Sequence, residues 1–352
     1  MPELRPTPLA ALLATAVLAS PVRLAAQGSG PYRLAGTDVA VYDLAGTVHL
    51  EAGSGGDVVV SVDRIGADAS KLRVEAGDVG GRSTLRVVFP ASRITYPEMG
   101  SGSSTTVRVG KDGTFDDDDD GGERVTITGR SGGLEAGANL RVAIPPGKRV
   151  TLHLAVGSAS VANVDGDITV SASSANVTAN GARGRLRLDT GSGDVRVTAT
   201  QAELDIDTGS GSVTVNGAKA DRVRLDTGSG DVTAADIDAR RLEVDVGSGS
   251  IAASKIHAPD VKLDGGSGDV EIALGGDVDD LVVDTGSGDV TIHLPDSLGA
   301  RIAVETGNGR IRTELPIQAT RLERDHLEGT IGDGRGRIRI ETGSGEVRLL
   351  KS

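Results

Sequence analysis

The stretch Asp226-Thr-Gly-Ser-Gly-Asp-Val232 recurs, with small changes, through the second half of the chain. Its first glycine and those of the other copies stand at positions 191, 209, 228, 247, 266, 286, 307 and 343. The steps between them are therefore 18, 19, 19, 19, 20, 21 and 36 residues. Degenerate copies begin at Gly157 and Ser173, and an isolated one begins at Gly53. A period of this kind predicts stacked repeats.

Apolar and polar residues alternate on both sides of each copy, which is the pattern of β-strands. Val223 and Leu225 precede the turn in one copy, and Val232 follows it. The Gly-Ser-Gly step supplies the conformations that a tight corner needs. Single hairpins could not each bury a core. We therefore predict an all-β fold, a β-solenoid (β-helix) of about 19-residue rungs with parallel sheets and Gly-Ser-Gly corner turns.

Composition excludes several classes of protein. The chain has 352 residues, with 51 glycines, five aromatic residues and neither Cys nor Trp. Disulfides, thiolate metal sites and Cys nucleophiles are therefore excluded. Asp and Glu number 50 against 37 Lys and Arg, a net charge of −13, which argues against nucleic-acid binding. The core must be built from Val, Leu, Ile and Ala.

The first 26 residues have the pattern of a secretory signal peptide. Arg5 precedes an apolar run over Leu9–Ala19, which is too short to span a bilayer. Cleavage is expected after Ala26, and the alternative is a buried N-terminal helix. No later run is apolar enough for a second membrane anchor. We expect an exported protein, periplasmic or on the cell surface or secreted.

The remaining chain divides into two regions. Residues 27–147 form a less regular N-terminal β region with a disordered acidic loop at 91–124, which holds the five aspartates Asp116–Asp120. Deleting Gly100–Gly122 should leave the fold intact if this loop is an appendage. Residues 148–352 form the regular β-solenoid, with an insert at 316–328 expected as one short helix or a long loop over the last rungs.

Three segments together resemble a known family. They are the repeated Thr-Gly-Ser-Gly-Asp-Val phrase, the pair Leu85–Pro90 and Leu140–Gly147, and the closing segment Gly329–Leu349. The chain is similar, over about residues 37–350, to the bacterial DUF4097 family of β-strand-repeat proteins, which are named "putative adhesins". The resemblance implies an exported β-solenoid. Departures are the Asp116–Asp120 loop and the degenerate copies at 157 and 173.

The repeated aspartates invite two chemical interpretations. Asp-Thr-Gly-Ser matches the aspartic-protease signature, but that enzyme needs two copies face to face, whereas this period places them in one column. Like charges about 4.8 Å apart repel by roughly 0.9 kcal/mol in water and roughly 3.5 at an effective dielectric of 20. Capping of the turns by Asp offsets this repulsion in the preferred interpretation. Calcium binding, as in nonapeptide repeats, is the alternative. The column and the turn-exit row comprise Asp189, Asp207, Asp226, Asp245, Asp264 and Asp284, then Asp231, Asp269 and Asp289.

Other reactive side chains show no catalytic or metal-binding spacing. The five histidines occupy different phases of the repeat, so surface or edge positions are expected for them. The corner serines lack a nucleophile elbow and a histidine at a matching phase, which favours a serine ladder. We predict no catalytic, cofactor-binding or metal-ligating residues. The residues concerned are His49, His153, His257, His293 and His326, and Ser192, Ser210, Ser229, Ser248, Ser267 and Ser287.

Three functions fit these observations. The preferred one is a non-catalytic exported scaffold, adhesin-like or envelope-associated, that binds an envelope protein or a glycan. A calcium-responsive surface protein is the alternative, and a polysaccharide-active β-helix enzyme is less favoured because residues 150–352 contain no aromatic side chain for sugar stacking. Binding is expected on the flat faces or at the 91–124 loop, with Tyr96 inside it and Phe89 beside it. Phe115 lies in the same loop.

Overall fold

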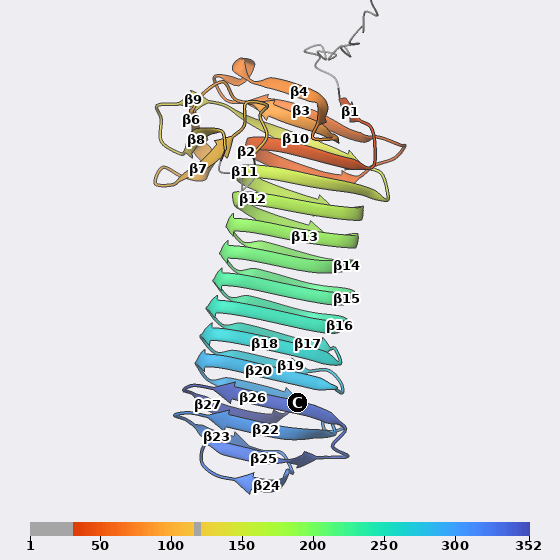
Figure 1. Cartoon of the computed structure of the whole chain (residues 1–352), viewed down its shortest axis with the longest axis vertical. Helices are drawn as coiled ribbons and strands as arrows, with labels where there is room; N and C mark the ends of the chain where they lie inside the picture. The colour runs from red at the N-terminus through yellow and green to blue at the C-terminus, as the bar shows by residue number, and fades with distance from the viewer. Residues whose placement is uncertain (1–30, 116–120) are drawn as a thin grey trace, which may run out of the picture.

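A computed structural model describes residues 31–115 and 121–352. The predicted signal peptide and Asp116–Asp120 lie outside the described residues. Figure 1 shows a long stack of strands with a broader head at its N-terminal end. The described helical elements are two short 3-10 turns, η1 (Ala69–Lys71) and η2 (Pro97–Met99). The prediction of an all-β fold with parallel strands in a large sheet is confirmed.

The stack, called here the rod, consists of strands paired in parallel with the next turn of the chain. Asp207 pairs with Asp226, and Asp226 pairs with Asp245, so each repeated phrase lies directly on the next. The strands run from β2 through β11 to β21. Their bounds are β2 (Asp38–Ala52), β11 (Lys148–Ala162), β12 (Asp165–Asn180), β13 (Arg183–Ser192), β14 (Val195–Ser210), β15 (Val213–Ser229), β16 (Val232–Ser248), β17 (Ile251–His257), β18 (Asp260–Ser267), β19 (Val270–Leu274), β20 (Asp280–Ser287) and β21 (Val290–Leu294).

The core of the rod is a stack of aliphatic side chains from every rung. Val223 and Leu225 are fully buried, and between them Arg224 points to solvent. The same alternation continues in the neighbouring rungs, because the register pairs Val223 with Leu242 and Leu225 with Val244. Each buried aliphatic side chain contributes about 1.5–3 kcal/mol. Stacking thus builds one continuous core along the rod.

The Gly-Ser-Gly corners depend on their second glycine. Gly230 has φ +138°, and a Cβ placed on it would overlap the backbone carbonyl of Gly211 in the rung below. Behind the corner, Thr227 is fully buried and its Oγ1 donates to that same carbonyl at 3.2 Å. A threonine occupies this position in six rungs. These residues are Thr190, Thr208, Thr227, Thr285, Thr306 and Thr342.

The head closes the N-terminal end of the rod with two sheets. Its larger sheet continues that of the rod, since β10 (Gly137–Ile144) pairs in parallel with β2. It also contains β1 (Tyr32–Leu34), β3 (Val58–Ile65), β4 (Arg73–Val79) and β5 (Arg82–Val88). The smaller sheet contains β6 (Arg93–Thr95), β7 (Ser104–Val109), β8 (Glu123–Thr128) and β9 (Leu134–Glu135). Because β2 is itself a rung beneath β11, the rod begins within the predicted N-terminal region rather than at residue 148.

The prediction of a single exposed loop over 91–124 is wrong for the described part of that segment. It supplies β6, β7 and the start of β8, and Val107 and Phe115 in it are buried. Glycine, serine and threonine residues interrupt the alternation of apolar and polar residues in this segment, so its strands could not be predicted from the pattern. Deletion of Gly100–Gly122 would remove β7, so we now expect it to unfold the smaller sheet.

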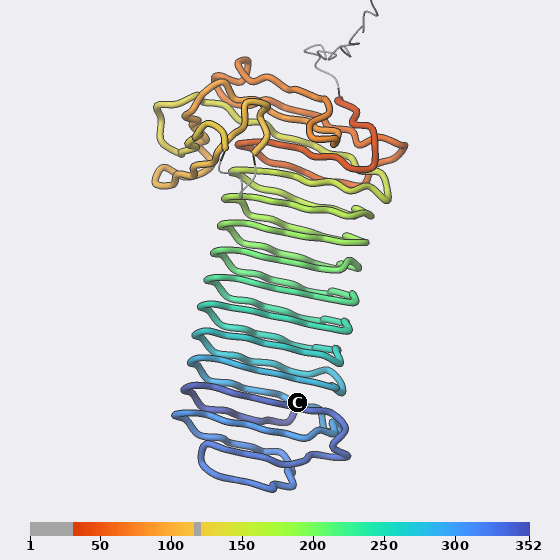
Figure 2. Tube along the Cα trace, in the orientation of Figure 1, coloured from red at the N-terminus to blue at the C-terminus, as the bar shows by residue number. Residues whose placement is uncertain are grey.

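The C-terminal end of the rod also differs from the prediction. The segment 316–328 forms no helix, but most of a β-hairpin of β24 (Gln318–Leu322) and β25 (His326–Ile331). β25 pairs antiparallel with β22 (Ala300–Thr306), which covers the last rung. Three further strands complete this end, namely β23 (Arg310–Thr313), β26 (Gly336–Thr342) and β27 (Glu346–Lys351). Figure 2 shows the chain turning back here, so that its end lies inside the stack. Within the described residues, no helix is long and apolar enough to cross a membrane.

Candidate functional site

One side of the rod, called here the charged face, carries columns of alternating charges. Arg187 lies 3.4 Å from Asp205 on the next rung, and Arg224 reaches Asp205 from the other side at 4.0 Å. Arg224 also contacts Asp226 on its own strand at 2.9 Å. A parallel column pairs Arg185 with Glu203 at 3.0 Å. Side chains here neutralise one another from rung to rung, and this exposed pairing adds little stability for each pair.

The repeated Asp-Thr-Gly-Ser aspartates form one outward column, as the register of the strands requires. They therefore do not face one another as a protease pair would. Partial burial, followed by the carboxylates of Asp207 and Asp245, raises the pKa of Asp226. The neighbouring Arg224 acts in the opposite direction. Repulsion within the column thus exceeds the compensation from arginine at this rung.

Replacing Asp226 by Asn should raise the stability of the protein at neutral pH. A carboxyl whose pKa is raised on folding stabilises the protein when protonated, and that contribution is lost as pH rises through the folded-state pKa. The benefit of Asp226→Asn should therefore shrink as pH falls through the raised folded-state pKa and disappear below 3.8, the ordinary pKa of this group. Thermal melts at pH 7 and pH 3 measure it. A loss of stability at pH 7 would instead show that the column needs this charge.

The turn-exit aspartates cap the backbone of the following rung. Asp231 accepts the N–H of Ser250 at 2.8 Å, and Asp194 accepts that of Ser212 at 3.0 Å. Asp269 accepts the N–H of Asp289 at 2.9 Å. Capping was predicted, but within the residue's own turn, whereas the observed bonds join successive rungs. Among residues 31–115 and 121–352, no group of three or more His, Asp or Glu residues is placed to hold a metal ion.

Asp231→Ala and Asp231→Asn separate capping from charge. The alanine variant leaves the Ser250 N–H without its acceptor, which should cost about 0.5–1.5 kcal/mol of unfolding free energy. The asparagine variant keeps an acceptor oxygen and should retain most of the stability. Chemical denaturation of both variants without added calcium measures this. Equal losses in the two variants would contradict capping as the role of Asp231.

The corner serines form a ladder at the start of the rod, where Ser192 Oγ donates to Ser174 Oγ at 3.1 Å. Of the histidines, His49 is exposed and lies 2.7 Å from Ser160 Oγ. The expectation of surface or edge histidines is wrong for His153, which is 5% exposed. Its ring stacks on Tyr42 of the neighbouring rung with centroids 4.4 Å apart, and Phe115 of the head lies edge-on to it at 6.3 Å, so it belongs to the packing between head and rod.

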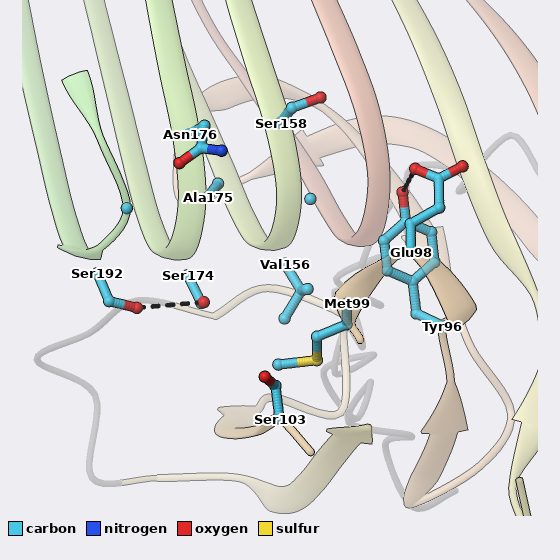
Figure 3. A pocket seen from close by; sticks show the side chains of 12 residues that line it. Tyr96, Glu98, Met99, Ser103, Val156, Ser158, Ser174, Ala175, Asn176 and Ser192 are labelled. Carbon is cyan, nitrogen blue, oxygen red and sulfur yellow. Dashed lines mark hydrogen bonds between the residues drawn. The ribbon is translucent and has the colours of Figure 1, made fainter. Parts of the chain in front are cut away.

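A groove opens where the head meets the first corners of the rod. We call it the head–rod groove, and its volume is about 430 Å³. Figure 3 shows Met99 and Ser103 of the head facing the corners that carry Val156, Ser174 and Ser192. The lining residues are Tyr96, Glu98, Met99, Ser103, Val156, Gly157, Ser158, Ser174, Ala175, Asn176, Ser192 and Gly193. The groove thus joins part of the 91–124 segment to three rungs of the rod.

Tyr96 fixes the head side of this groove. The residue is 3% exposed, and its hydroxyl donates to Glu98 Oε2 at 2.8 Å. Burial, and then the Glu98 carboxylate, raise the pKa of Tyr96, so the phenol stays protonated. Phe89 and Phe115 are also buried. The aromatic residues of this region are therefore packing residues, whereas we expected them at a binding surface.

Asp43 lies beneath the same junction and was not singled out in the sequence. It is fully buried, Oδ1 accepts the Ala45 N–H at 3.5 Å, and Oδ2 has no hydrogen-bond partner. Desolvation raises its pKa well above 3.8, against a smaller opposite effect of the backbone N–H groups. The register from β2 to β13 places Asp43 in the column that continues as Leu154, Ala172 and Thr190. Only this alignment of rungs reveals that Asp43 stands at an inner corner position.

Comparison with known proteins supports the fold assigned from the repeats. Residues 180–350 match a family model described as Toastrack DUF4097. This part of the chain belongs to the DUF4097 family. The match begins at the end of β12, so the head and the first rungs of the rod lie outside it, although the resemblance was expected from about residue 37.

Two further comparisons complete this result. A solved structure of a "putative cell adhesion protein from Clostridium sporogenes ATCC 15579" is 10% identical, with 92% of this chain and 98% of that chain covered and a TM-score of 0.23. A TM-score this low does not place the two chains in one fold. No curated protein matches the chain.

Proposed function

We propose that this protein is an exported, non-catalytic scaffold of the cell envelope whose head–rod groove binds a protein or glycan partner. In this proposal the rod is a spacer of about 19-residue rungs that holds the head at its end. The N-terminal segment with Arg5 and the apolar run Leu9–Ala19 supports export to the periplasm or the cell surface.

The observation that carries the proposal is the contrast between rod and groove. On the rod, described charged side chains such as Arg187, Asp205 and Arg224 contact one another from rung to rung. The groove breaks the repeat, because it places Met99 and Ser103 of the head against the corners of three rungs. Functional sites are expected where a regular pattern is violated.

The lining of the groove suits a polar partner with some apolar surface. Ser103 and Asn176 are exposed and offer a hydroxyl and an amide, whereas Met99 offers a flexible apolar contact. The corner backbones of Gly157 and Gly193 form the opposite wall. A volume of about 430 Å³ lies within the range of ligand sites. Sugar hydroxyls or an extended peptide would satisfy such a surface.

Ser103→Arg tests the groove with little risk to the fold. The described hydrogen bonds of Ser103 involve its backbone alone: its N–H donates to Gly100 O, and its carbonyl accepts from Thr128 Oγ1 and the Gly129 N–H. A long side chain here should therefore fill the groove and leave these bonds intact. Ser104→Arg is the matched control, because Ser104 is exposed on β7 and does not line the groove. Both variants of the full chain are compared with wild type for retention of solubilised envelope proteins and of purified cell-wall glycan.

The wild-type and Ser104→Arg proteins should retain the same component, and Ser103→Arg should lose it. Equal retention by both variants would place binding elsewhere on the molecule. Turnover of a glycan during the assay would contradict a non-catalytic role. Circular dichroism of each variant shows whether a loss reflects misfolding.

A further inference from the structure

The alternation of opposite charges on the charged face breaks down in the last rung of the rod. β26 is inserted there between β20 and β22, so that Arg337 is paired with Asp280 on one side and with Arg301 on the other. Figure 1 shows these strands beside one another, with β25 beyond β22. Residues 300–352 carry ten Lys and Arg against eight Asp and Glu, whereas residues 148–299 carry 13 against 24. This end of the rod is therefore basic in an acidic protein.

A pocket of about 430 Å³ lies on this basic end, and we call it the arginine pocket. Its cationic lining residues are Arg301 of β22 and Arg337 and Arg339 of β26. The strand register places the short side chain of Ala303 between Arg339 on one side and Glu328 of β25 on the other. All five side chains are exposed. Ala303 thus leaves a hollow between longer charged side chains.

The arginines of this pocket are only partly neutralised by the protein. Arg339 forms an ion pair with Glu341 on its own strand. Arg337 lies 3.7 Å from Asp280 Oδ1, but that oxygen has no hydrogen-bond partner, so the contact is a loose one. Within residues 31–115 and 121–352, no carboxylate forms an ion pair with Arg301. The pocket therefore holds guanidinium charge that the described carboxylates leave uncompensated.

Two of the guanidinium groups come from directly opposed positions. Arg301 and Arg337 are paired on neighbouring strands, which lie about 4.8 Å apart. Like charges directly opposite each other destabilise a sheet, and arginine cannot lose its proton in a protein. The carboxylate among the lining residues is that of Glu328, and its Oε1 lies 3.1 Å from His326 Nε2. An anion between Arg301 and Arg337 would supply the missing counter-charge.

A second hollow of the charged face, of about 410 Å³, provides the contrast. It is lined by four arginines, of which Arg185 lies 3.0 Å from Glu203. Arg222 lies 2.5 Å from Glu243, and the other two arginines contact Asp205. Every arginine of that hollow has a carboxylate partner, so an added anion would have to displace one. The arginine pocket does not impose this cost at Arg301.

We propose that the arginine pocket binds a phosphate monoester, carried either by a soluble molecule such as a sugar or by a lipid headgroup. Such a group has a charge of about −1.5 to −2 at neutral pH and three acceptor oxygens. It can therefore accept hydrogen bonds from Arg301 and Arg337 together, in the planar geometry that guanidinium groups favour. Thr330, which is paired with Arg301 from β25 and lines the pocket, adds a hydroxyl donor.

Glucose 6-phosphate tests the pocket, with glucose as the matched compound that lacks the phosphate. Calorimetric titration of the full chain should show binding of the first and not of the second. Arg301→Gln should weaken this binding about tenfold or more, because it removes a charged donor. Arg335→Gln is the matched control, since Arg335 is exposed just before β26, does not line the pocket and removes the same charge. Its affinity should equal that of wild type.

Ala303→Gln separates the shape of the pocket from its charge. The same column holds Val282 and Arg339 in the two preceding rungs, so the fold should accept a longer side chain at this exposed position. Glutamine fills the hollow without changing the net charge, and it should weaken binding as Arg301→Gln does. Circular dichroism of each variant shows whether the rod is intact.

Vesicles form the second arm of the experiment and distinguish the two sources of the phosphate. Sedimentation of wild type with phosphatidylcholine vesicles that contain phosphatidic acid, and not with pure phosphatidylcholine, would assign the lipid headgroup. Binding of glucose 6-phosphate alone would assign a soluble ligand. Failure to bind either probe, or equal affinities of Arg301→Gln and Arg335→Gln, would overturn the proposal. The head–rod groove takes no part in this assay, so such a failure would leave its proposed function untouched.

Discussion

Replacing Asp43 by Thr should stabilise the protein by about 1–3 kcal/mol at neutral pH, because it removes a buried carboxylate that has one oxygen without a partner. Threonine occupies the same inner corner position in other rungs, as Thr190, Thr208 and Thr227. Thr is uncharged but similar to Asp in shape. Its hydroxyl can donate to a corner carbonyl, as that of Thr227 does. Thermal unfolding at pH 7 measures the gain.

The pH dependence of this gain follows from the raised pKa of Asp43. The protonated carboxyl stabilises the folded state, and this contribution is lost as pH rises through the folded-state pKa. The difference between wild type and Asp43→Thr should therefore be largest at neutral pH and vanish below 3.8. The reverse substitution, Thr208→Asp, should lower the stability of the rod, the opposite of the gain expected for Asp43→Thr. A less stable Asp43→Thr protein at pH 7 would show that the head–rod junction requires the carboxylate.

Replacing Gly230 by Ala should cost about 3 kcal/mol or more of unfolding free energy. The alanine would have to adopt φ +138° and would press its Cβ onto the carbonyl of Gly211. Neither strain can relax locally, because both backbones belong to ladders that continue along the rod. Chemical denaturation of the purified variant measures the loss.

Gly77→Ala is the matched control for this experiment. Gly77 lies in β4 of the head without a positive φ, and a Cβ placed on it would meet no atom within 4 Å. Its substitution should change the unfolding free energy by less than about 1 kcal/mol. Equal losses in the two variants would contradict the steric role of the second corner glycine.

The rod could be predicted from sequence because each rung repeats the same local pattern. Alternation around Leu225, the glycines of the corner and the fixed period all favour the same structure, as they do in ideal repeats. The inserted last rung could not be found in this way. The step of 36 residues before Gly343 indicated only about two periods of the repeat, whereas pairing of β26 with β20 is a long-range choice between similar edges.

The head and its groove escaped prediction for different physical reasons. β6 and β7 are short, and their neighbours Gly100 and Gly102 look like a loop in isolation, so burial of Val107 by tertiary packing decided their structure. The groove combines residues that are about 60 positions apart, such as Met99 and Val156. The position of Asp43 could not be predicted, because it aligns with the inner corner residues of the other rungs only once β2 is known to be a rung of the rod.

Hydrogen exchange of the full chain with its retained envelope component tests the central proposal most directly, because it maps the contact residue by residue. We predict slower exchange of amides around Met99–Ser103 and at the corners near Gly157, Ala175 and Gly193, with no change along the charged face from Arg187 to Asp245. Protection of the charged face with an unchanged groove would contradict the account, since it would make the rod itself the binding surface.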